Sequence, residues 1–233
     1  LILPMAERAE MMVDVQEKYS QLVKAKCIAF QTNLCGPMEV DIIPLVEGVD
    51  ELMNMGEMLE EYCHLREERL ESEQRSMRGF IARSDPSLQN GLVPAVLSAK
   101  VAIHEQYVFQ ERRGMPVFPV IGVGSLPFRG GLTPYTCKEF LKEYRGVRTV
   151  TVQSAFRYDY PVADVKKAVR YLNKELAGAE DIAPQPPDKR AIAELNDIFS
   201  RPYRRTIGGV SPLINSIAEF IPLTGEEIRR FTE

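Results

Sequence analysis

The chain has 233 residues, of which 45% are hydrophobic and 27% charged, and its net charge is −4. These values are typical of a soluble globular protein, and the acidic balance argues against duplex nucleic acid as a partner, because that binding needs a concentrated basic surface. No apolar run approaches the roughly 20 residues of a membrane span, so we expect a cytoplasmic protein without a membrane segment.

Five apolar runs of strand length alternate with segments of helical period. The runs cover residues 1–5, 39–47, 78–85, 116–124 and 148–156, and the first helical segment extends from Ala6 to about Lys26. Strands without polar alternation are typical of a sheet that is buried on both faces, and alternation with helices predicts parallel pairing. No GxGxxG motif follows the first run, which makes a dinucleotide-binding fold less favoured.

Five β/α units are fewer than the eight units, in about 250 residues, of a complete barrel. We therefore predict an α/β fold that is the C-terminal portion of a TIM-type (β/α)8 barrel, with additional C-terminal helices. The barrel portion covers 1–176, a Pro-rich connector 177–189, and a helical tail that packs on the barrel 190–233. Helices in the tail are expected near 190–199, 211–221 and 225–231. Because the chain begins within an apolar run, we also expect a fragment of a longer protein.

The four cysteines bear on the redox compartment. Cys27, Cys35, Cys63 and Cys137 show neither CxxC spacing nor the density of a disulfide-rich domain. We therefore expect reduced, packed thiols, in agreement with a cytoplasmic location.

Polar or charged side chains lie at or just beyond the ends of the last four runs of strand length. These are Glu47, Arg83 with Asp85, Arg129, and Gln153 with Arg157. The carboxyl ends of the strands carry the active site in β/α barrels, so we expect these side chains to converge. Arg129 is the one charge in the glycine-rich stretch 121–134, and an arginine in such a loop usually has an anionic partner.

Glu47 and Asp85 are two carboxylates separated by about one β/α unit. Such a pair, with room for water, suits Mg²⁺, which often takes one or two carboxylates plus substrate oxygens. The alternative is that each carboxylate belongs to a helix start. Glu47 would cap the helix that begins near Val49, and Asp85, which is followed by Pro86, would begin the helix there. Arg83 shares strand parity with Asp85, so a regular strand would point both into one cavity; a buried ion pair is the alternative for Arg83.

The stretch "SRPYRRTIGGV" at 200–210 adds a basic cluster. Arg201, Arg204 and Arg205 lie within five residues and are followed by a glycine pair. Such a cluster suits bidentate binding of phosphate, and the alternative is a solvated basic helix end. Together, two carboxylates and several arginines indicate phosphoryl or enolate chemistry with a divalent cation.

Five blocks in order carry a resemblance to a known family. They are "IPLVEGVDEL", "RGFIARSDPSLQNGLVPAV", "GSLPFRGGLTP", "VQSAFRYD" and "SRPYRRTIGGVSPL". The set resembles phosphoenolpyruvate carboxylase of the short, archaeal type, from residue 1 to about 222. The resemblance implies a cytoplasmic, homotetrameric enzyme that converts phosphoenolpyruvate and bicarbonate to oxaloacetate and phosphate. It also implies that a histidine and an arginine of the site lie in an N-terminal half that this chain lacks.

The resemblance further implies roles for single residues. Glu47 and Asp85 would bind Mg²⁺ or Mn²⁺, and Arg129, on a mobile loop, would bind bicarbonate or stabilise the phosphoryl group. We assign Arg83 as a second catalytic residue from its predicted place beside Asp85. Substrate binding falls to Arg201, with Arg204 and Arg205 beside it, to Gln153, and to Leu45 and Phe80 as an apolar wall.

Two alternatives stay open for the function. One is a magnesium-dependent oxo-acid aldolase or lyase of the citrate lyase β-subunit type, which also uses acidic strand ends. The extra arginines and the tail after residue 190 count against it. The other is a non-catalytic fragment or subunit, which the missing N-terminal half favours.

Overall fold

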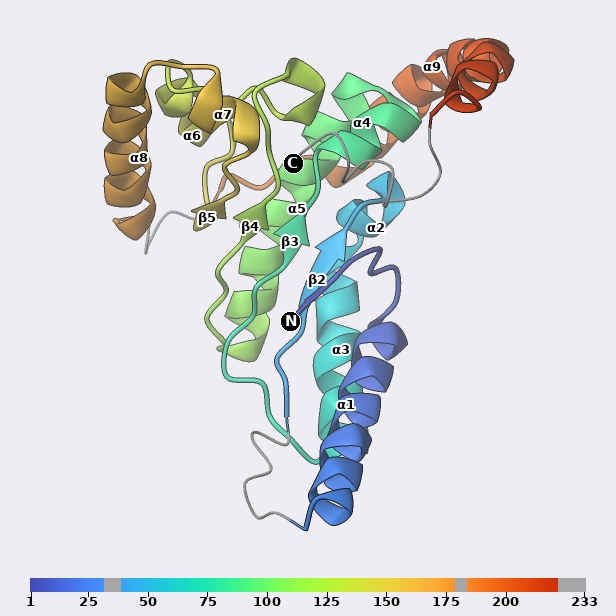
Figure 1. Ribbon diagram of the computed structural model, residues 1–233, viewed down its shortest axis with the longest axis vertical. Helices are drawn as coiled ribbons and strands as arrows, with labels where there is room; N and C mark the ends of the chain where they lie inside the picture. The colour runs from blue at the N-terminus through green and yellow to red at the C-terminus, as the bar shows by residue number, and fades with distance from the viewer. Residues whose placement is uncertain (32–38, 179–183, 222–233) are drawn as a thin grey trace.

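The computed structural model describes residues 1–31, 39–178 and 184–221, and a parallel sheet lies at its centre (Figure 1). The strands are β1 (Ile2–Leu3), β2 (Ile43–Val46), β3 (Phe80–Ile81), β4 (Val120–Ile121) and β5 (Thr149–Val150). The longer helices are α1 (Ala9–Ala29), α3 (Met55–Leu70), α5 (Leu92–Arg113), α8 (Val162–Ala177) and α9 (Lys189–Ala218). The shorter ones are α2 (Val49–Met53), α4 (Ser84–Asn90), the 3₁₀ turn η1 (Pro127–Arg129), α6 (Cys137–Glu143) and α7 (Ser154–Tyr158).

The five strands pair in parallel in the order β1-β2-β3-β4-β5. Each strand lies beside the one that precedes it in the chain, so the described sheet has no point at which the order reverses, as it would in a doubly wound fold. All five predicted runs contain a strand, which confirms the α/β class and the parallel pairing. The regular strands are shorter than the runs, because pairing covers four residues in β2 and two in β1.

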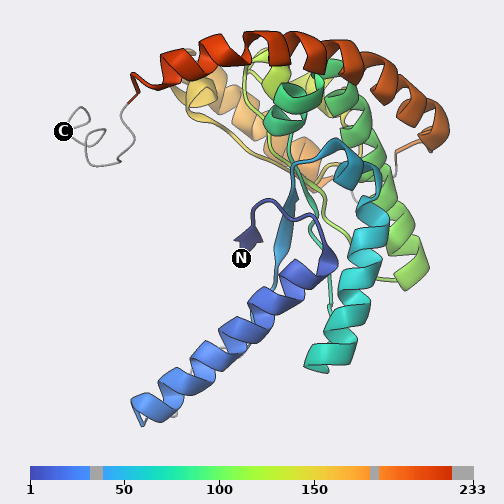
Figure 2. The same cartoon turned by 90° about the vertical axis from the view of Figure 1, so that its right-hand side faces the viewer.

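The two faces of the sheet differ in what covers them. Val46, Ile81 and Ile121 occupy one register row, are fully buried, and belong to the core formed with the helices. Side chains alternate across a strand, so Leu45 and its register partner Phe80 point to the opposite face and are half-buried. Figure 2 shows α3 and α5 behind the core-facing side and α9 arching above the strand ends.

The chain after the connector forms one long helix in place of the two separate helices expected before residue 222. α9 runs unbroken from Lys189 to Ala218 with Pro202 and Pro212 inside it. A proline removes one backbone hydrogen bond and bends a helix without having to end it, and Figure 2 shows the resulting arch. The segment predicted at 225–231 lies outside the described residues, and the division into barrel, connector and tail stays a prediction.

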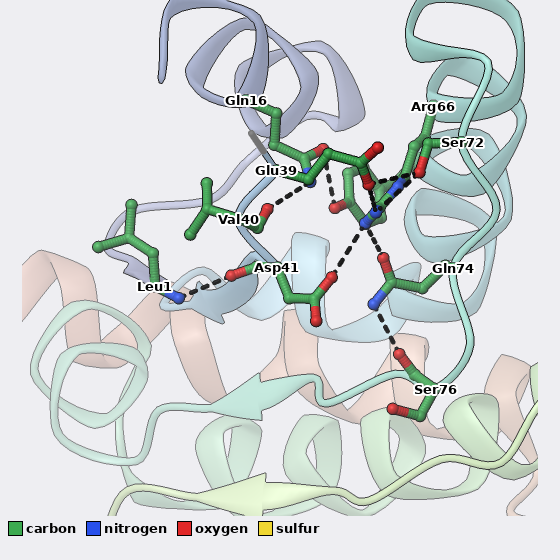
Figure 3. Close-up of polar contacts among 10 residues, drawn as sticks. Leu1, Gln16, Glu39, Val40, Asp41, Arg66, Ser72, Gln74 and Ser76 are labelled. Carbon is green, nitrogen blue, oxygen red and sulfur yellow. Dashed lines mark hydrogen bonds and ion pairs between the residues drawn. The ribbon is translucent and has the colours of Figure 1, made fainter. Parts of the chain in front are cut away.

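A buried arginine organises the segments that lead into β2 and β3 (Figure 3). Arg66 of α3 donates to Asp41 over 3.2 Å and to Glu39 over 3.1 Å, ahead of β2. It also donates to Ser72 over 3.2 Å and to Gln74, in the segment before β3. Its side chain is buried, and the two carboxylates compensate the cost of burying its charge. No sequence motif marked this cluster, because it depends on contacts between distant segments.

Two observations bear on the compartment of the protein. Cys63 and Cys137 are buried free thiols, as predicted, but Cys27 is disulfide-bonded. The prediction of reduced cysteines is therefore wrong for Cys27, because spacing rules detect metal motifs and disulfide-rich frameworks and overlook a single bridge. Cys35 lies outside the described residues. Among the residues described, no helix combines the length and the apolar character needed to cross a bilayer.

Candidate active site

Four of the predicted site residues meet at one edge of the sheet. Glu47 directly follows β2, Asp85 lies in the first turn of α4 after β3, Arg129 ends η1 after β4, and Gln153 caps α7 after β5. Because the strands are parallel and pair in chain order, their carboxyl ends form a continuous edge. The structure thus places all four residues directly after consecutive strands, and their roles in a common site stay predictions.

Glu47 and Asp85 form a pair of carboxylates. Oε2 of Glu47 accepts a hydrogen bond of 2.8 Å from the backbone N–H of Met5. Burial raises the pKa of the Glu47 carboxyl, the Met5 N–H opposes this effect, and the neighbouring Asp85 raises the pKa further. Two carboxylates that repel each other fit a divalent cation, which would relieve the repulsion. Within the described residues, no group of three or more acidic, histidine or cysteine side chains is arranged to hold a metal ion.

The alternative roles of these carboxylates at helix starts have different outcomes. α2 begins after Gly48 without a side-chain hydrogen bond at its cap, and Glu47 instead contacts the β1–α1 loop through Met5. Asp85 does lie in the first turn of α4 and is followed by Pro86, as the alternative predicts, and a carboxylate there interacts favourably with the helix dipole. Capping therefore does not account for Glu47, whereas Asp85 combines a place at a helix start with its place beside Glu47.

Arg129 and Gln153 form the second pair at this edge. Nη1 of Arg129 donates to Oε1 of Gln153 over 3.1 Å. A Cβ atom on Gly124 would lie 2.2 Å from that same oxygen, so only glycine leaves room for the pair. Gly130 has φ +107°, and a Cβ atom there would lie 2.7 Å from Val123. The glycines of this loop thus set the place of Arg129 through close approach and backbone conformation.

Arg83 is directed differently from the prediction. Its Nε donates to the hydroxyl of Tyr144 over 2.9 Å, and Nη1 donates to Oγ of Ser87 over 3.3 Å. The predicted regular strand ends early, since β3 stops at Ile81 and α4 begins at Ser84, so strand parity no longer relates Arg83 to Asp85. The guanidinium is 1% exposed and forms no ion pair with a carboxylate in the described part of the chain. The alternative of a buried ion pair is therefore not found there either.

The three predicted arginines of α9 differ in their contacts. Arg204 donates to Oδ1 of Asn90 at the end of α4, and the hydroxyl of the preceding Tyr203 donates to the carbonyl of Leu88 over 3.0 Å. Arg201 is exposed and pairs over 2.7 Å with Asp197 of its own helix, and Arg205 is exposed as well. The structure thus brings Arg204 to α4, whereas Arg201 and Arg205 lie on solvent-facing parts of the helix.

Leu45 and Phe80 lie as an apolar surface beside the carboxylates. They are register partners on neighbouring strands, and Leu45 shares its side of the sheet with Glu47 two residues on. The ring of Phe80 covers Gly122 of the next strand segment, where a Cβ atom would lie 2.9 Å from the ring. Leu45 and Phe80 are therefore neighbours on the same side of the sheet, and their role as an apolar wall of the site stays a prediction.

Sequence reasoning overlooked the groups that hold these residues in place. They are the Met5 N–H on Glu47, Tyr144 and Ser87 on Arg83, and Asn90 on Arg204. Tyr144 and Asn90 lie in ordinary helical patterns that carry no motif. Only their three-dimensional contacts reveal them.

Comparison with known proteins agrees with the residue pattern. A family model described as phosphoenolpyruvate carboxylase matches residues 1–230. The chain is 34% identical over 221 residues to the phosphoenolpyruvate carboxylase of Leuconostoc mesenteroides, and 35% identical over 231 residues to that of Metallosphaera sedula. It is 34% identical over 229 residues to that of Pyrococcus horikoshii.

The coverage of these matches is unequal. They include 95% of this chain, but 44% of the Leuconostoc and Metallosphaera proteins and 46% of the Pyrococcus protein. The chain therefore spans less than half the length of these relatives. The match over nearly all of its own residues, from bacteria and archaea alike, shows that the chain belongs to the phosphoenolpyruvate carboxylase family.

Proposed function

We propose that this chain carries the metal-binding and phosphoryl-binding part of a phosphoenolpyruvate carboxylase. The observation that carries the proposal is the placement of Glu47, Asp85, Arg129 and Gln153 on four consecutive strand ends. This arrangement offers a cation site beside an anion site, which phosphoryl transfer requires. The relatives from Leuconostoc mesenteroides and Metallosphaera sedula are both named as phosphoenolpyruvate carboxylases, and neither is named as an aldolase or a citrate lyase.

We infer that the sheet is five of the eight β/α units of a TIM-type barrel. The sequential parallel order supports this, because barrels wind in one direction whereas doubly wound sheets reverse. Gathering of the polar residues at the carboxyl edge supports it further. The remaining units would come from the part of the protein that the relatives have beyond this match.

Glu47 and Asp85 are the residues that would hold Mg²⁺ or Mn²⁺. When bound, the cation supplies Lewis-acid stabilisation to phosphate and enolate oxygens. Two carboxylates at this edge match the usual protein share of a magnesium site, which keeps several water or substrate ligands. The hydrogen bond from Met5 engages one oxygen of Glu47, so the other oxygen would be the one offered to the cation.

The proposed reaction proceeds in two stages. An oxygen of bicarbonate attacks the phosphorus of phosphoenolpyruvate, and the bond between phosphorus and the enol oxygen breaks. This yields carboxyphosphate and the enolate of pyruvate. Carboxyphosphate then releases phosphate and CO₂, and the enolate carbon bonds to CO₂ to form oxaloacetate. Atoms and charge balance without an oxidant or a reductant.

This chain's residues would act on both stages. Arg129, with Nη1 held by Gln153, places a cation where the transferred phosphoryl group gathers negative charge. Arg204 at α4 adds a second cation near that edge. Leu45 and Phe80 offer CO₂ an apolar surface and exclude water, which limits loss of the intermediate. Arg83 stays a predicted catalytic residue that would act from its buried place, and Arg201 and Arg205 stay predicted phosphate ligands.

Assembly and location stay predictions from the family resemblance. A homotetramer and a cytoplasmic location are implied in that way, with phosphoenolpyruvate and bicarbonate as the partners of the site. A non-catalytic role for this chain alone is the second candidate, because it spans 44% of the Leuconostoc relative.

The test replaces the matched 221-residue stretch of the Leuconostoc mesenteroides protein by this chain. We expect the folded chimera to release phosphate only with bicarbonate, in equal amount to the oxaloacetate formed, and to lose both with a metal chelator. This chain alone, assayed in parallel, is expected to be inactive. A folded chimera that binds Mg²⁺ but releases no phosphate would support the non-catalytic alternative.

A further inference from the structure

α9 carries one stripe of side chains that is covered at its start and open at its end. The stripe consists of residues spaced alternately by four and three: Asn196, Ser200, Tyr203, Ile207, Val210, Ile214 and Ile217. Such spacing keeps side chains on one face of a helix. Asn196 and Ser200 are each 7% exposed, whereas exposure rises to 37% at Ile207 and 57% at Ile217. We call Ile207, Val210, Ile214 and Ile217 the open stripe.

The covered part of the stripe shows what kind of surface the helix packs on. Tyr203 donates its hydroxyl to the carbonyl of Leu88 in α4 and lies against Gly91 at the start of α5. The helix thus rests on β/α units at the carboxyl ends of the strands. Past Tyr203 it continues beyond these units and overhangs the side of the sheet opposite α3 and α5 (Figure 2).

The composition of the overhanging segment argues against a solvated or membrane-bound helix end. Apolar residues flank the open stripe, among them Leu213 at 62% exposure, and contiguous apolar surface of this kind marks an interaction site. From Thr206 to Ile221 the one charged residue is Glu219. Interfacial membrane helices carry lysine and arginine on their polar face, which this segment lacks.

We propose that the open stripe docks on the further β/α portion of a phosphoenolpyruvate carboxylase chain, the portion that lies outside the match to this chain. This portion would extend the surface that α4 and α5 provide to the covered part of the stripe. The relatives place more than half their length outside the match. In the described residues β1 and β5 also pair on one edge alone, so the same portion can extend the sheet beneath the helix.

The proposal rests on the proposed function for the identity of the partner, but its test reads binding rather than turnover. The remaining portion of the Leuconostoc mesenteroides protein is expressed separately and mixed with this chain, and with the relative's own matched stretch as a positive control. Size-exclusion chromatography with light scattering is expected to show a one-to-one complex. Hydrogen–deuterium exchange is expected to slow over 207–217 in the complex.

A matched pair of variants locates the interface. Ile214→Asp places a charge in the open stripe, and Asn215→Asp places the same charge one residue away, off the stripe. We expect Ile214→Asp to raise the Kd of the complex at least about tenfold, because the isoleucine side chain no longer buries its apolar surface against the partner, and Asn215→Asp to change the Kd little. Circular dichroism checks that both variants keep the helix, which the exposure of these sites favours.

Several outcomes would overturn the proposal. One is that the relative's own two parts form a complex, whereas this chain does not bind the remaining portion of the relative, either as a separate chain or when joined to it in the chimera. Others are unchanged exchange over 207–217 in any complex or in the chimera, and equal effects of the two variants. Self-association of this chain that Ile214→Asp abolishes would assign the stripe to a second copy instead. A complex that meets these binding criteria but shows no turnover would support the proposed interface and contradict the proposed function.

Discussion

Arg129 and Gln153, which follow different strands, are joined by a hydrogen bond of 3.1 Å from Nη1 to Oε1. The contact closes a loop that Gly124 allows to approach β5, because any larger residue at position 124 would overlap the Gln153 amide. It leaves the rest of the guanidinium available to an anion. The pair therefore joins the loop after β4 to the strand end after β5 in one unit, which we propose binds an anion.

Replacing Arg129 should reduce turnover strongly. In the chimeric enzyme, Arg129→Ala is expected to lower bicarbonate-dependent phosphate release at least about 100-fold, the scale for losing a preorganised charge partner. Arg157→Ala is the control, because Arg157 is an arginine that follows the next strand, β5, but is exposed. Its Cζ lies 5.0 Å from the centroid of the Tyr158 ring. Near-normal turnover of Arg129→Ala would remove Arg129 from the mechanism.

Gly124→Ala should disturb the same unit without removing a charge. Its Cβ atom would lie 2.2 Å from Oε1 of Gln153, at the end of a flexible side chain. We therefore expect the Gln153 amide to move away from Arg129, with lower turnover and a loss of about 1 kcal/mol or less in the free energy of unfolding, the scale of one hydrogen bond. Gly208→Ala in α9 is the opposite control, because nothing lies within 4 Å of its Cβ position. Urea unfolding should show Gly208→Ala stabilised by about 0.5–1 kcal/mol, as expected within a helix; equal effects at both sites would contradict the tight fit at Gly124.

The acidic pair should control cation affinity. Asp85→Asn is expected to weaken Mg²⁺ binding by roughly tenfold or more, at least as much as losing an outer-shell partner. Calorimetric titration of the chimera measures this directly, and Asp50→Asn, an exposed acid in the first turn of α2, is the control. Unchanged affinity in Asp85→Asn would show that Asp85 does not bind the cation.

The parts of this site that were predictable are those fixed by chain order. Glu47, Asp85, Arg129 and Gln153 follow apolar runs directly, so parallel pairing of those runs dictates a common edge. Arg83 escaped prediction because β3 ends at Ile81, four residues before the end of the predicted run, and α4 begins at Ser84.

Long-range contacts set the rest of the fold, and sequence patterns do not encode them locally. Arg66 is held by Asp41, 25 residues away, and Cys27 is disulfide-bonded without a spacing motif. Whether Arg201 faces a ligand depends on where α9 rests, and there it pairs with Asp197. The unbroken course of α9 through Pro202 and Pro212 was likewise not predictable, because a proline favours a helix end in the local pattern.

The hydrogen bond from Arg83 to Tyr144 should contribute to stability. Tyr144→Phe keeps the ring 5.8 Å from the guanidinium carbon but removes the hydroxyl that accepts from Nε over 2.9 Å. We expect a loss of about 1–3 kcal/mol, because a buried charged donor would lose its partner. Tyr135→Phe removes an exposed hydroxyl that donates to Asp164 and should cost less than about 1 kcal/mol, the usual scale of a single hydrogen bond. Urea unfolding of the two variants distinguishes them, and equal losses would mean that Arg83 is solvated.

Cys63 should be chemically inert in the folded chain. The thiol is 1% exposed, and burial raises its pKa from the usual 9.0 to about 11. The thiolate is the reactive form, so alkylation by iodoacetamide at about pH 8 should be much slower in the folded chain than in urea, as mass spectrometry of the Cys63 peptide will show. Because the folded pKa is the higher one, the stability linked to this group is complete below pH 9 and declines as the pH rises toward 11. Equal labelling of folded and unfolded chain at that pH would show that the helix bearing Cys63 opens readily.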